Sequence, residues 1–262
     1  LTKKVQEWLG DWLPEAISCH TIWPVAELAE SLAKKYEIPW WVNVHGHDFD
    51  VSLQGPLSNH IKRLALASTQ LIVASERLAK IGNEQKPAID SIFIPCHTEV
   101  DKEWKRQIEK WNGRWRKDKL EVLFPADPRR PEKRYVLALK ACSELGKRGW
   151  DVHIGGLSLV SKSKVFDRMI TCDVALITSR REVGPIVARE AIICGLPVAS
   201  VNVGDLAAWL PKDCISIDES PQAIADAVEA ALKYSNENYQ IPKLYLKPAV
   251  ILSLEEMITQ IH

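Results

Sequence analysis

The sequence is 262 residues long, 46% hydrophobic and 26% charged, with a formal net charge of +0. This balance is typical of a folded globular protein with one large or two smaller domains, and it excludes the basic composition of a general nucleic-acid binder. No apolar run reaches the ~18–20 residues of a membrane-spanning helix, and no N-terminal signal pattern is visible. The six cysteines are scattered without a CxxC pair, so we expect buried free thiols in a cytoplasmic protein.

Short apolar runs alternate with amphipathic stretches along nearly the whole sequence, as in βαβ units with parallel sheets. The runs predicted as strands are residues 16–19, 40–44, 71–74, 91–94, 120–124, 151–155, 174–178, 198–201 and 214–217. The 3.6-residue periodicity predicts helices at residues 25–36, 60–67, 135–148, 185–194 and 221–234. We therefore predict an α/β protein with two Rossmann-like parallel-sheet domains.

A polar, basic stretch interrupts the series of strands and predicts the domain boundary. The expected parts are a first domain at 1–100, a linker at 101–118, a second domain at 119–245 and a C-terminal helix at 246–262 that crosses back to the first domain. Four apolar side chains of the linker fall on one helical face: Trp104, Ile108, Trp111 and Trp115. This face either contacts an anionic membrane at its periphery or packs between the two halves, and Gly113 favours packing because it weakens a long interfacial helix.

The stretch SRREVGPIVAREAIICGLPVA at residues 179–199 directly follows a predicted strand. In open α/β sheets, ligands bind in the crevice at the carboxyl ends of the strands. Pro185 suits the first position of a helix, and Gly195 suits the left-handed position after its end. The sequence therefore predicts a helix at 185–194 whose N-terminus faces such a crevice.

The first amides of this helix, at Ile186 and Val187 with Gly184 beside them, form an anion site suited to phosphate. Glu190 lies about one turn into the helix, where its carboxylate can accept hydrogen bonds from ribose hydroxyls. Glu182 precedes the amides and can contact whatever is attached to the phosphate. This layout fits a nucleotide-sugar, although the spacing alone equally allows both acids to be solvated surface charges.

The same stretch resembles the signature of retaining GT-B glycosyltransferases of family 4. The matching positions are Ser179, Arg180, Glu182, Gly184, Pro185, Glu190, Ala191, Cys194, Gly195, Pro197, Val198, Val203, Gly204 and Asp205. Val183 stands where the family usually has Gly, which would narrow the loop beside the donor sugar.

A second match, LFPADPRRPEKR at residues 123–134, resembles the family's loop whose Arg and Lys bind the donor diphosphate. Lys133 matches the lysine, but Pro128 stands where the arginine is common. Either Arg129 or Arg130 would then supply the guanidinium, which binds phosphate oxygens bidentately. The alternative is that these charges form only a solvated basic turn.

The first hundred residues resemble the latter part of the family's acceptor-side domain. His45 in VNVHGHD matches the histidine that the family places near the donor sugar and the acceptor hydroxyl, whereas Cys96 and His97 replace the usual Asn-Gly. His45 and His47, together with the distant His20, also allow a zinc site. We rank this below the glycosyltransferase interpretation, because the resemblance implies that neither a metal nor another cofactor is needed.

Compared with a typical family member, the sequence lacks roughly the first third, so the N-terminal domain is expected to be incomplete. A trimmed chain, a naturally short enzyme and a split enzyme are the three explanations. Self-association or a partner subunit would then complete that domain.

The resemblance implies a glycosyltransferase that moves a sugar from a nucleotide-diphosphate donor to an unknown acceptor, with retention. The alternatives are a non-catalytic nucleotide-sugar-binding or assembly subunit that needs a partner chain and, more distantly, a GT-B epimerase. The expected catalytic residues are His45 and Glu182, and the expected donor-binding residues are Arg129, Arg130, Lys133, Gly184, Pro185, Ile186, Val187 and Glu190.

Overall fold

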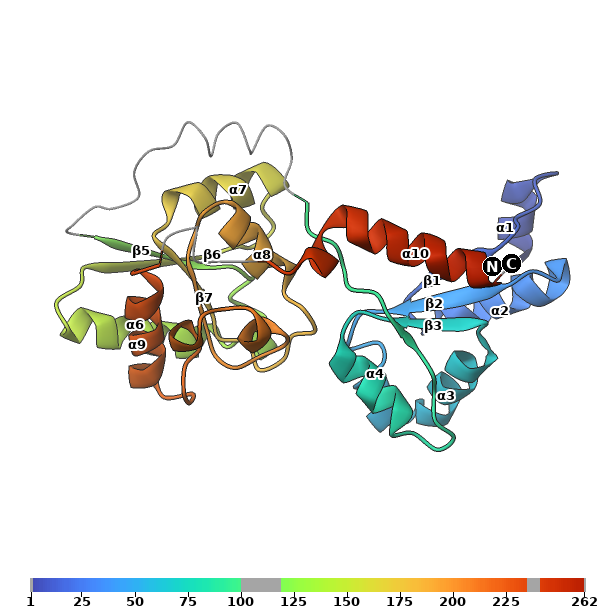
Figure 1. Cartoon of the computed structure of the whole chain (residues 1–262), viewed down its shortest axis with the longest axis horizontal. Helices are drawn as coiled ribbons and strands as arrows, with labels where there is room; N and C mark the ends of the chain where they lie inside the picture. The colour runs from blue at the N-terminus through green and yellow to red at the C-terminus, as the bar shows by residue number, and fades with distance from the viewer. Residues whose placement is uncertain (1, 100–118, 235–240, 262) are drawn as a thin grey trace. The chain divides into compact units, whose positions relative to one another are not determined.

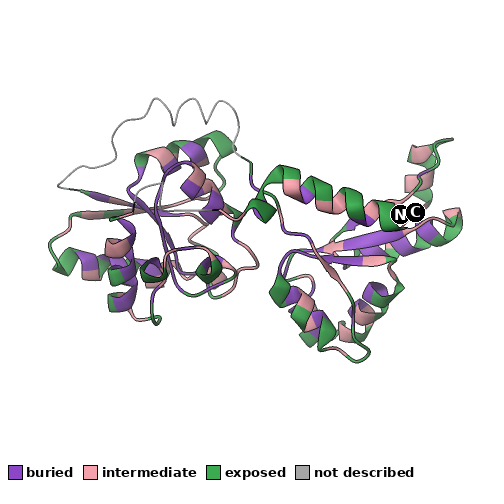
Figure 2. Ribbon diagram, viewed as in Figure 1, coloured by how far each residue is buried: buried purple, intermediate pink, exposed green. Residues whose placement is uncertain are grey.

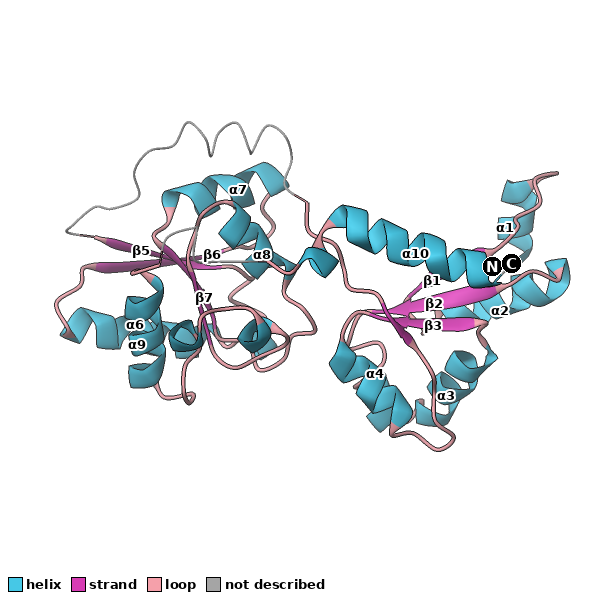
Figure 3. Cartoon of the chain, in the orientation of Figure 1, coloured by secondary structure: helices cyan, strands magenta, loops and turns pink. Residues whose placement is uncertain are grey.

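The computed structural model describes residues 2–99, 119–234 and 241–261, and the chain divides into two compact units (Figure 1). Unit 1 comprises Leu1–Cys96 with Pro248–His262, and unit 2 comprises His97–Lys247. Each unit contains its own four-stranded parallel sheet with helices packed against it (Figure 3). The expected linker at 101–118, with its tryptophan-bearing face, lies outside the described residues.

The sheet of unit 1 has its strands in chain order, β1-β2-β3-β4. The strands are β1 (Ile17–His20), β2 (Trp40–Val44), β3 (Gln70–Val73) and β4 (Ile92–Phe93). The helices are α1 (Thr2–Leu9), α2 (Val25–Tyr36), α3 (Ser58–Ala67), α4 (Glu76–Asn83) and, from the end of the chain, α10 (Lys247–Ile261). The inner strand β2 is buried at every position except the partly exposed Asn43, as expected for a parallel strand covered by helices on both sides.

The C-terminal helix α10 packs on the sheet of unit 1. Val250 and Met257 of α10 are buried in one cluster with Trp41 of β2, Ile72 of β3 and Ile94. The residues of α10 are close to those of the sheet in the fold although about 155 to 215 positions separate them along the chain. The last helix therefore supplies part of the core of unit 1.

The sheet of unit 2 has the order β6-β5-β7-β8. Its strands are β5 (Leu120–Phe124), β6 (Val152–Gly156), β7 (Val174–Ile177) and β8 (Val198–Ser200). Its α-helices are α6 (Tyr135–Lys147), α7 (Lys162–Thr171), α8 (Ile186–Ile193) and α9 (Pro221–Ala231). The chain moves from β5 outward to β6 and then returns to the other side of β5 at β7. The carboxyl ends of β5 and β7 therefore form a topological switch point, where open α/β sheets bind ligands.

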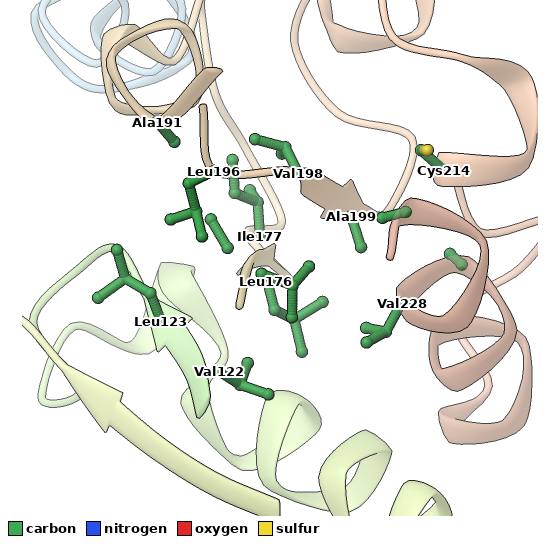
Figure 4. Packing of buried hydrophobic residues seen from close by; sticks show 14 of the residues in the cluster. Val122, Leu123, Leu176, Ile177, Ala191, Leu196, Val198, Ala199, Cys214 and Val228 are labelled. Carbon is green, nitrogen blue, oxygen red and sulfur yellow. The ribbon is translucent and has the colours of Figure 1, made fainter. Parts of the chain in front are cut away.

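The core of unit 2 is formed by fully buried aliphatic side chains of the sheet and of the helices that cover it. Figure 4 shows Val122, Leu176 and Val198 from neighbouring strands in one buried cluster with residues of α8 and α9, including Ala191 and Val228. In both units the strands are mostly buried and the outer helix faces are exposed (Figure 2). The rigid sheet and its short helices hold the loops at the carboxyl ends of the strands in place.

Most expected elements are present, but three differences are informative. The strand expected at 214–217 is wrong: the chain there forms a 3₁₀ turn at Lys212–Cys214, and Ile215 makes only an isolated bridge to Ser200. The helix expected at 185–194 begins one residue later, because Pro185 has an extended ψ of 100° and is the N-cap of α8. Helices α4 and α7 were not anticipated, and among the described residues no helix is long and apolar enough to cross a membrane.

Candidate functional site

The loops that follow β5 and β7 are joined by hydrogen bonds at the switch point of unit 2. The buried hydroxyl of Thr178, directly after β7, donates to the carbonyls of Lys133 and Arg134 at 3.0 and 3.1 Å. In return, Nε of Arg134 donates to the carbonyl of Thr178 at 2.6 Å, and the amide of Arg180 donates to the carbonyl of Glu132 at 2.8 Å. These bonds satisfy buried backbone groups, so the two loops form one rigid surface.

Lys133 and Glu182 meet on this surface. The ammonium Nζ of Lys133 lies 2.5 Å from Oε1 of Glu182, and the two side chains are only 14% and 15% exposed. A pair so removed from water interacts more strongly than an exposed one, because the effective dielectric constant is lower. The structure thus brings together two of the residues expected at the site, which are 49 positions apart.

A narrow crevice runs past this ion pair. Its lining residues come from β5, β7, the two loops and the start of α8: Phe124, Pro125, Ala126, Lys133, Leu176, Ile177, Thr178, Ser179, Glu182 and Val187. The first amides of α8 have no intrahelical acceptor, and Pro185 forms no side-chain cap. The crevice therefore combines an ammonium, a carboxylate and free helix amides, groups that together suit an anionic ligand bearing hydroxyls.

Two glycines allow the loop after β7 to lie close against the loop after β8. A Cβ on Gly184 would stand 3.1 Å from Oδ2 of Asp205. Gly204 has a left-handed φ of +63°, and a Cβ there would stand 3.2 Å from Cβ of Glu182 and 3.3 Å from Cδ of Pro185. The position of the Glu182 backbone thus depends on the absence of a side chain at Gly204.

Arg189 is a buried charged residue that the sequence analysis did not single out. It is 1% exposed; its Nε donates to Oγ1 of Thr98 at 2.8 Å, and Nη1 lies 3.5 Å from Oδ2 of Asp205. Its guanidinium also stacks on the ring of Tyr245, 4.3 Å from the centroid. The available signal was an arginine beside Glu190 in the mainly apolar run IVAREAII.

Asp205 has one carboxylate oxygen, Oδ1, that is buried without a hydrogen-bond partner among the described residues. The other oxygen of this carboxylate, Oδ2, lies against Gly184 in the loop after β7. A buried acceptor without a partner costs free energy, and a ligand hydroxyl would remove that cost.

Glu190 lies one turn inside α8 and is half-buried. Burial raises the pKa of its carboxyl group, while Lys162 and Arg189 act in the opposite direction. A carboxylate held in this way gains from any donor that reaches it, because its charged form is poorly solvated. This environment is compatible with the expected ribose contact.

Arg129 and Arg130 are not among the residues that line the crevice. Arg129 binds Asp127, with 2.6 Å between Nη2 and Oδ2, and holds the pKa of that carboxyl well below its usual range. Arg130 binds Glu132 at 2.5 Å and instead lines an open groove beside Tyr135 at the start of α6. Both guanidiniums are therefore engaged by neighbouring carboxylates.

His45 belongs to unit 1, where it follows β2. Its Nε2 lies 3.3 Å from Nδ1 of His20 at the end of β1, and its amide donates to Oδ1 of Asp48 at 3.0 Å. Packing of protein atoms around His45 lowers its pKa, and His20 acts in the same direction while Asp48 opposes it. Among the described residues, no cluster of three or more His, Cys, Asp or Glu has the arrangement of a metal site.

No family model matches this sequence, and no curated protein sequence matches it. Solved structures do resemble it. A UDP-forming α,α-trehalose-phosphate synthase from Burkholderia xenovorans gives a TM-score of 0.72 at 12% identity, covering 100% of this chain and 76% of the other.

Two further structures give the same result. A sucrose-phosphate synthase from Thermosynechococcus elongatus gives a TM-score of 0.64 at 16% identity, over 99% of this chain and 76% of the other. A trehalose-6-phosphate synthase, studied for glycosyltransfer with retention, gives 0.64 at 12% identity, over 99% and 77%. Together with the two parallel-sheet units, these likenesses show that the chain has the GT-B fold.

Proposed function

We propose that the protein is a glycosyltransferase that transfers a sugar from a nucleotide-diphosphate sugar, with retention, as the resemblance to family 4 implies. The observation that carries the proposal is the Lys133–Glu182 pair beside the free amides of α8, at the switch point of a GT-B fold. GT-B structural neighbours include a synthase named as UDP-forming, which makes UDP the first nucleotide to test.

In this mechanism the chain acts by positioning and by stabilising charge. When the bond between the anomeric carbon and the diphosphate breaks, Lys133 and the α8 amides at Ile186 and Val187 stabilise the negative charge of the leaving diphosphate. Glu190 holds the ribose, and Glu182 holds the hydroxyls of the donor sugar. These steps use only groups of the chain and the substrates, and the proposal requires no metal.

The other expected residues complete the proposal. Gly184 and Pro185 would shape the loop that carries Glu182, and His45 would act on the reacting sugar and the acceptor, as the resemblance to family 4 implies. Of the two expected arginines, Arg130 must leave Glu132, and Arg129 must leave Asp127, before it can bind phosphate. Each arginine is exposed enough to reorient, since the side chains are 58% and 69% exposed respectively.

The proposal also includes where the protein is located and whether it associates with other chains. None of the six cysteines is joined in a disulfide bond, and a cytoplasmic location is part of the proposal. In the sheet of unit 1, β1 is an edge strand, and edges of this kind are covered by other chains in many proteins. Self-association or a partner subunit through unit 1 follows, and a protein that stays monomeric in sedimentation at high concentration would count against it.

The decisive experiment is calorimetric binding of UDP, GDP and ADP, followed by assays of sugar transfer and donor hydrolysis. Lys133→Ala should weaken nucleoside diphosphate binding by about 30- to 100-fold, because one charge-assisted hydrogen bond contributes ~2–3 kcal/mol. Lys147→Ala is the matched control, since this lysine pairs with Glu144 in the last turn of α6. Equal binding by both variants would refute the donor site, whereas binding without transfer or hydrolysis would indicate a non-catalytic subunit.

A further inference from the structure

One thiol of the chain differs from the other five in its surroundings. Five cysteines are buried, with exposures between 0% and 7%: Cys19, Cys142, Cys172, Cys194 and Cys214. Burial raises the pKa of Cys19 to about 11 and that of Cys142 to about 12, so neither is a nucleophile at neutral pH. Cys96 alone among the six is partly exposed.

The thiol of Cys96 lies beside a base. Its Sγ is 3.6 Å from Nδ1 of His45, and the other ring nitrogen of His45 is 3.3 Å from Nδ1 of His20. The two imidazole rings are nearly parallel, with 4° between their planes. Cys96, His45 and His20 therefore form a continuous chain of one thiol and two imidazoles at the carboxyl ends of strands of unit 1; His20 is the last residue of β1, and His45 directly follows β2.

The protonation state of His45 suits the role of a base. Its pKa lies below the ordinary value, so the imidazole is neutral at pH 7. In the tautomer without a proton on Nδ1, it accepts the hydrogen of the Cys96 thiol. Two ionisable groups act on the pKa of His45: His20 destabilises its charged form, and Asp48 stabilises it. Removal of the thiol proton leaves a thiolate that a cationic His45 stabilises.

We propose that Cys96 is a modification site, a nucleophilic thiol that His45 activates toward alkylating agents and hydroperoxides. With an alkyl iodide, the S–C bond forms as the C–I bond breaks, iodide leaves, and the thiol proton moves to His45. With a hydroperoxide, sulfur bonds to the terminal oxygen as the O–O bond breaks. The proton held by His45 then passes to the leaving oxygen, giving a sulfenic acid and water or an alcohol.

Modification also has a consequence for activity, which rests on the proposed function. A group attached to Cys96 occupies space directly against His45, the residue that the proposed mechanism places next to the sugar. Oxidation or alkylation should therefore stop sugar transfer while nucleotide binding by unit 2 is retained. Oxidation of the thiol would thus switch off sugar transfer without affecting nucleotide binding.

The test is the rate of iodoacetamide alkylation of the whole folded chain between pH 5 and pH 10, measured by intact mass and peptide mapping. We expect one adduct, at Cys96, with a half-maximal rate below pH 8. An ordinary thiol has a pKa of about 8.5 and is only ~3% ionised at pH 7. A wild-type profile centred near 8.5, or labelling spread over several cysteines, would overturn the proposal.

Two variants identify the base. His45→Gln should slow alkylation at pH 7 about fivefold to tenfold and move the profile to that of an ordinary thiol. His153→Gln, which removes an exposed histidine of β6 in unit 2, should leave the rate unchanged. Equal rates for His45→Gln and the wild type would contradict the role of His45, and the wild-type profile remains a test even if this variant does not fold.

The alkylation rates require no nucleotide or acceptor, so they separate this proposal from the proposed function. UDP binding and transfer are then measured before and after single-site labelling, with Cys96→Ser as the control that cannot be labelled. Retained transfer by the labelled wild type would refute the switch. Absence of UDP binding in the unlabelled protein would instead refute the proposed donor site.

Discussion

At the scale of single residues, the half-buried carboxylate of Glu190 should lower the stability of the folded protein at neutral pH. Burial raises the pKa of its carboxyl group in the folded chain. The folded state therefore binds the proton more tightly than the unfolded state, whose pKa is about 4.3. Stability from this group is present below that unfolded value and is lost as the pH rises to the folded value. At neutral pH the ionised carboxylate destabilises the free protein.

Glu190→Gln should consequently melt at a higher temperature than the wild type at pH 7, and the difference should vanish near pH 4. The same change should weaken nucleotide binding, because a neutral amide accepts weaker hydrogen bonds from ribose hydroxyls than a carboxylate does. Calorimetric melting at both pH values and UDP titration measure the two effects. A variant that melts lower at pH 7 and binds UDP as well as the wild type would contradict the assigned role.

Glu182 occupies Lys133 in the free protein, since the two charged groups are 2.5 Å apart. A diphosphate that binds Lys133 must compete with this carboxylate. Glu182→Gln should therefore bind free UDP several-fold more tightly and lose transfer, because the amide competes less for the ammonium but holds the donor sugar poorly. Glu219→Gln is the control, as its carboxylate is 63% exposed and pairs with Arg134. Weaker UDP binding by Glu182→Gln would argue that the pair itself forms the site.

At the scale of elements, the close approach of the loops after β7 and β8 depends on Gly204. Ala at this position would keep an unfavourable φ of +63° and press its Cβ on Glu182 and Pro185. Gly204→Ala should lower the free energy of unfolding by about 2–3 kcal/mol, about 1 of it from the backbone, and should weaken UDP binding. Gly149 also has a positive φ, +98°, but a Cβ there would meet open space. Gly149→Ala should therefore lose only the backbone contribution to the free energy of unfolding, and it should bind UDP normally. Chemical denaturation and UDP titration distinguish the two variants, and equal losses would refute the contact.

The elements could be predicted from sequence where periodicity and caps agree. Strands at 40–44 and 120–124 have the expected bounds, and Gly195 takes the expected left-handed φ of +69°. Helices α4 and α7 were missed, although Ser75 and Ser161 each cap one of them through the side chain. The apolar residues 214–217 suggested a strand, but a single bridge cannot sustain one.

The residues of the candidate site could be predicted in part, because they follow predicted strands. The loops with Lys133 and Glu182 meet because the carboxyl ends of β5 and β7 are adjacent. The sequence placed each loop after a strand, but it did not give the order of the strands in the sheet. Spacing carries no information about ion pairs between neighbours, so the engagement of Arg129 by Asp127 could not be foreseen. The contacts of Arg189 with Thr98 and Tyr245 join residues about 90 and 56 positions away, which only the tertiary structure reveals.

At the scale of the whole molecule, the chain forms two units with separate cores, and one of them is discontinuous in sequence. Residues 248–262 belong to unit 1 through the cluster around Met257 of α10. The free energy that this helix contributes should therefore stabilise unit 1 selectively. A nucleotide site built entirely from loops of unit 2 should be insensitive to it.

Met257→Ala tests this separation. Met257 is 2% exposed, and loss of its side chain should leave a cavity against the sheet that costs about 2–4 kcal/mol. Hydrogen exchange should accelerate in peptides of β2 and β3 and stay unchanged in peptides of β5 and β7, with UDP binding retained. Leu252→Ala is the matched control, because this leucine of α10 is 58% exposed and its truncation removes few contacts. Acceleration in both sheets would show instead that the two units unfold as one cooperative body, in which case substitutions in either unit would be felt at the nucleotide site.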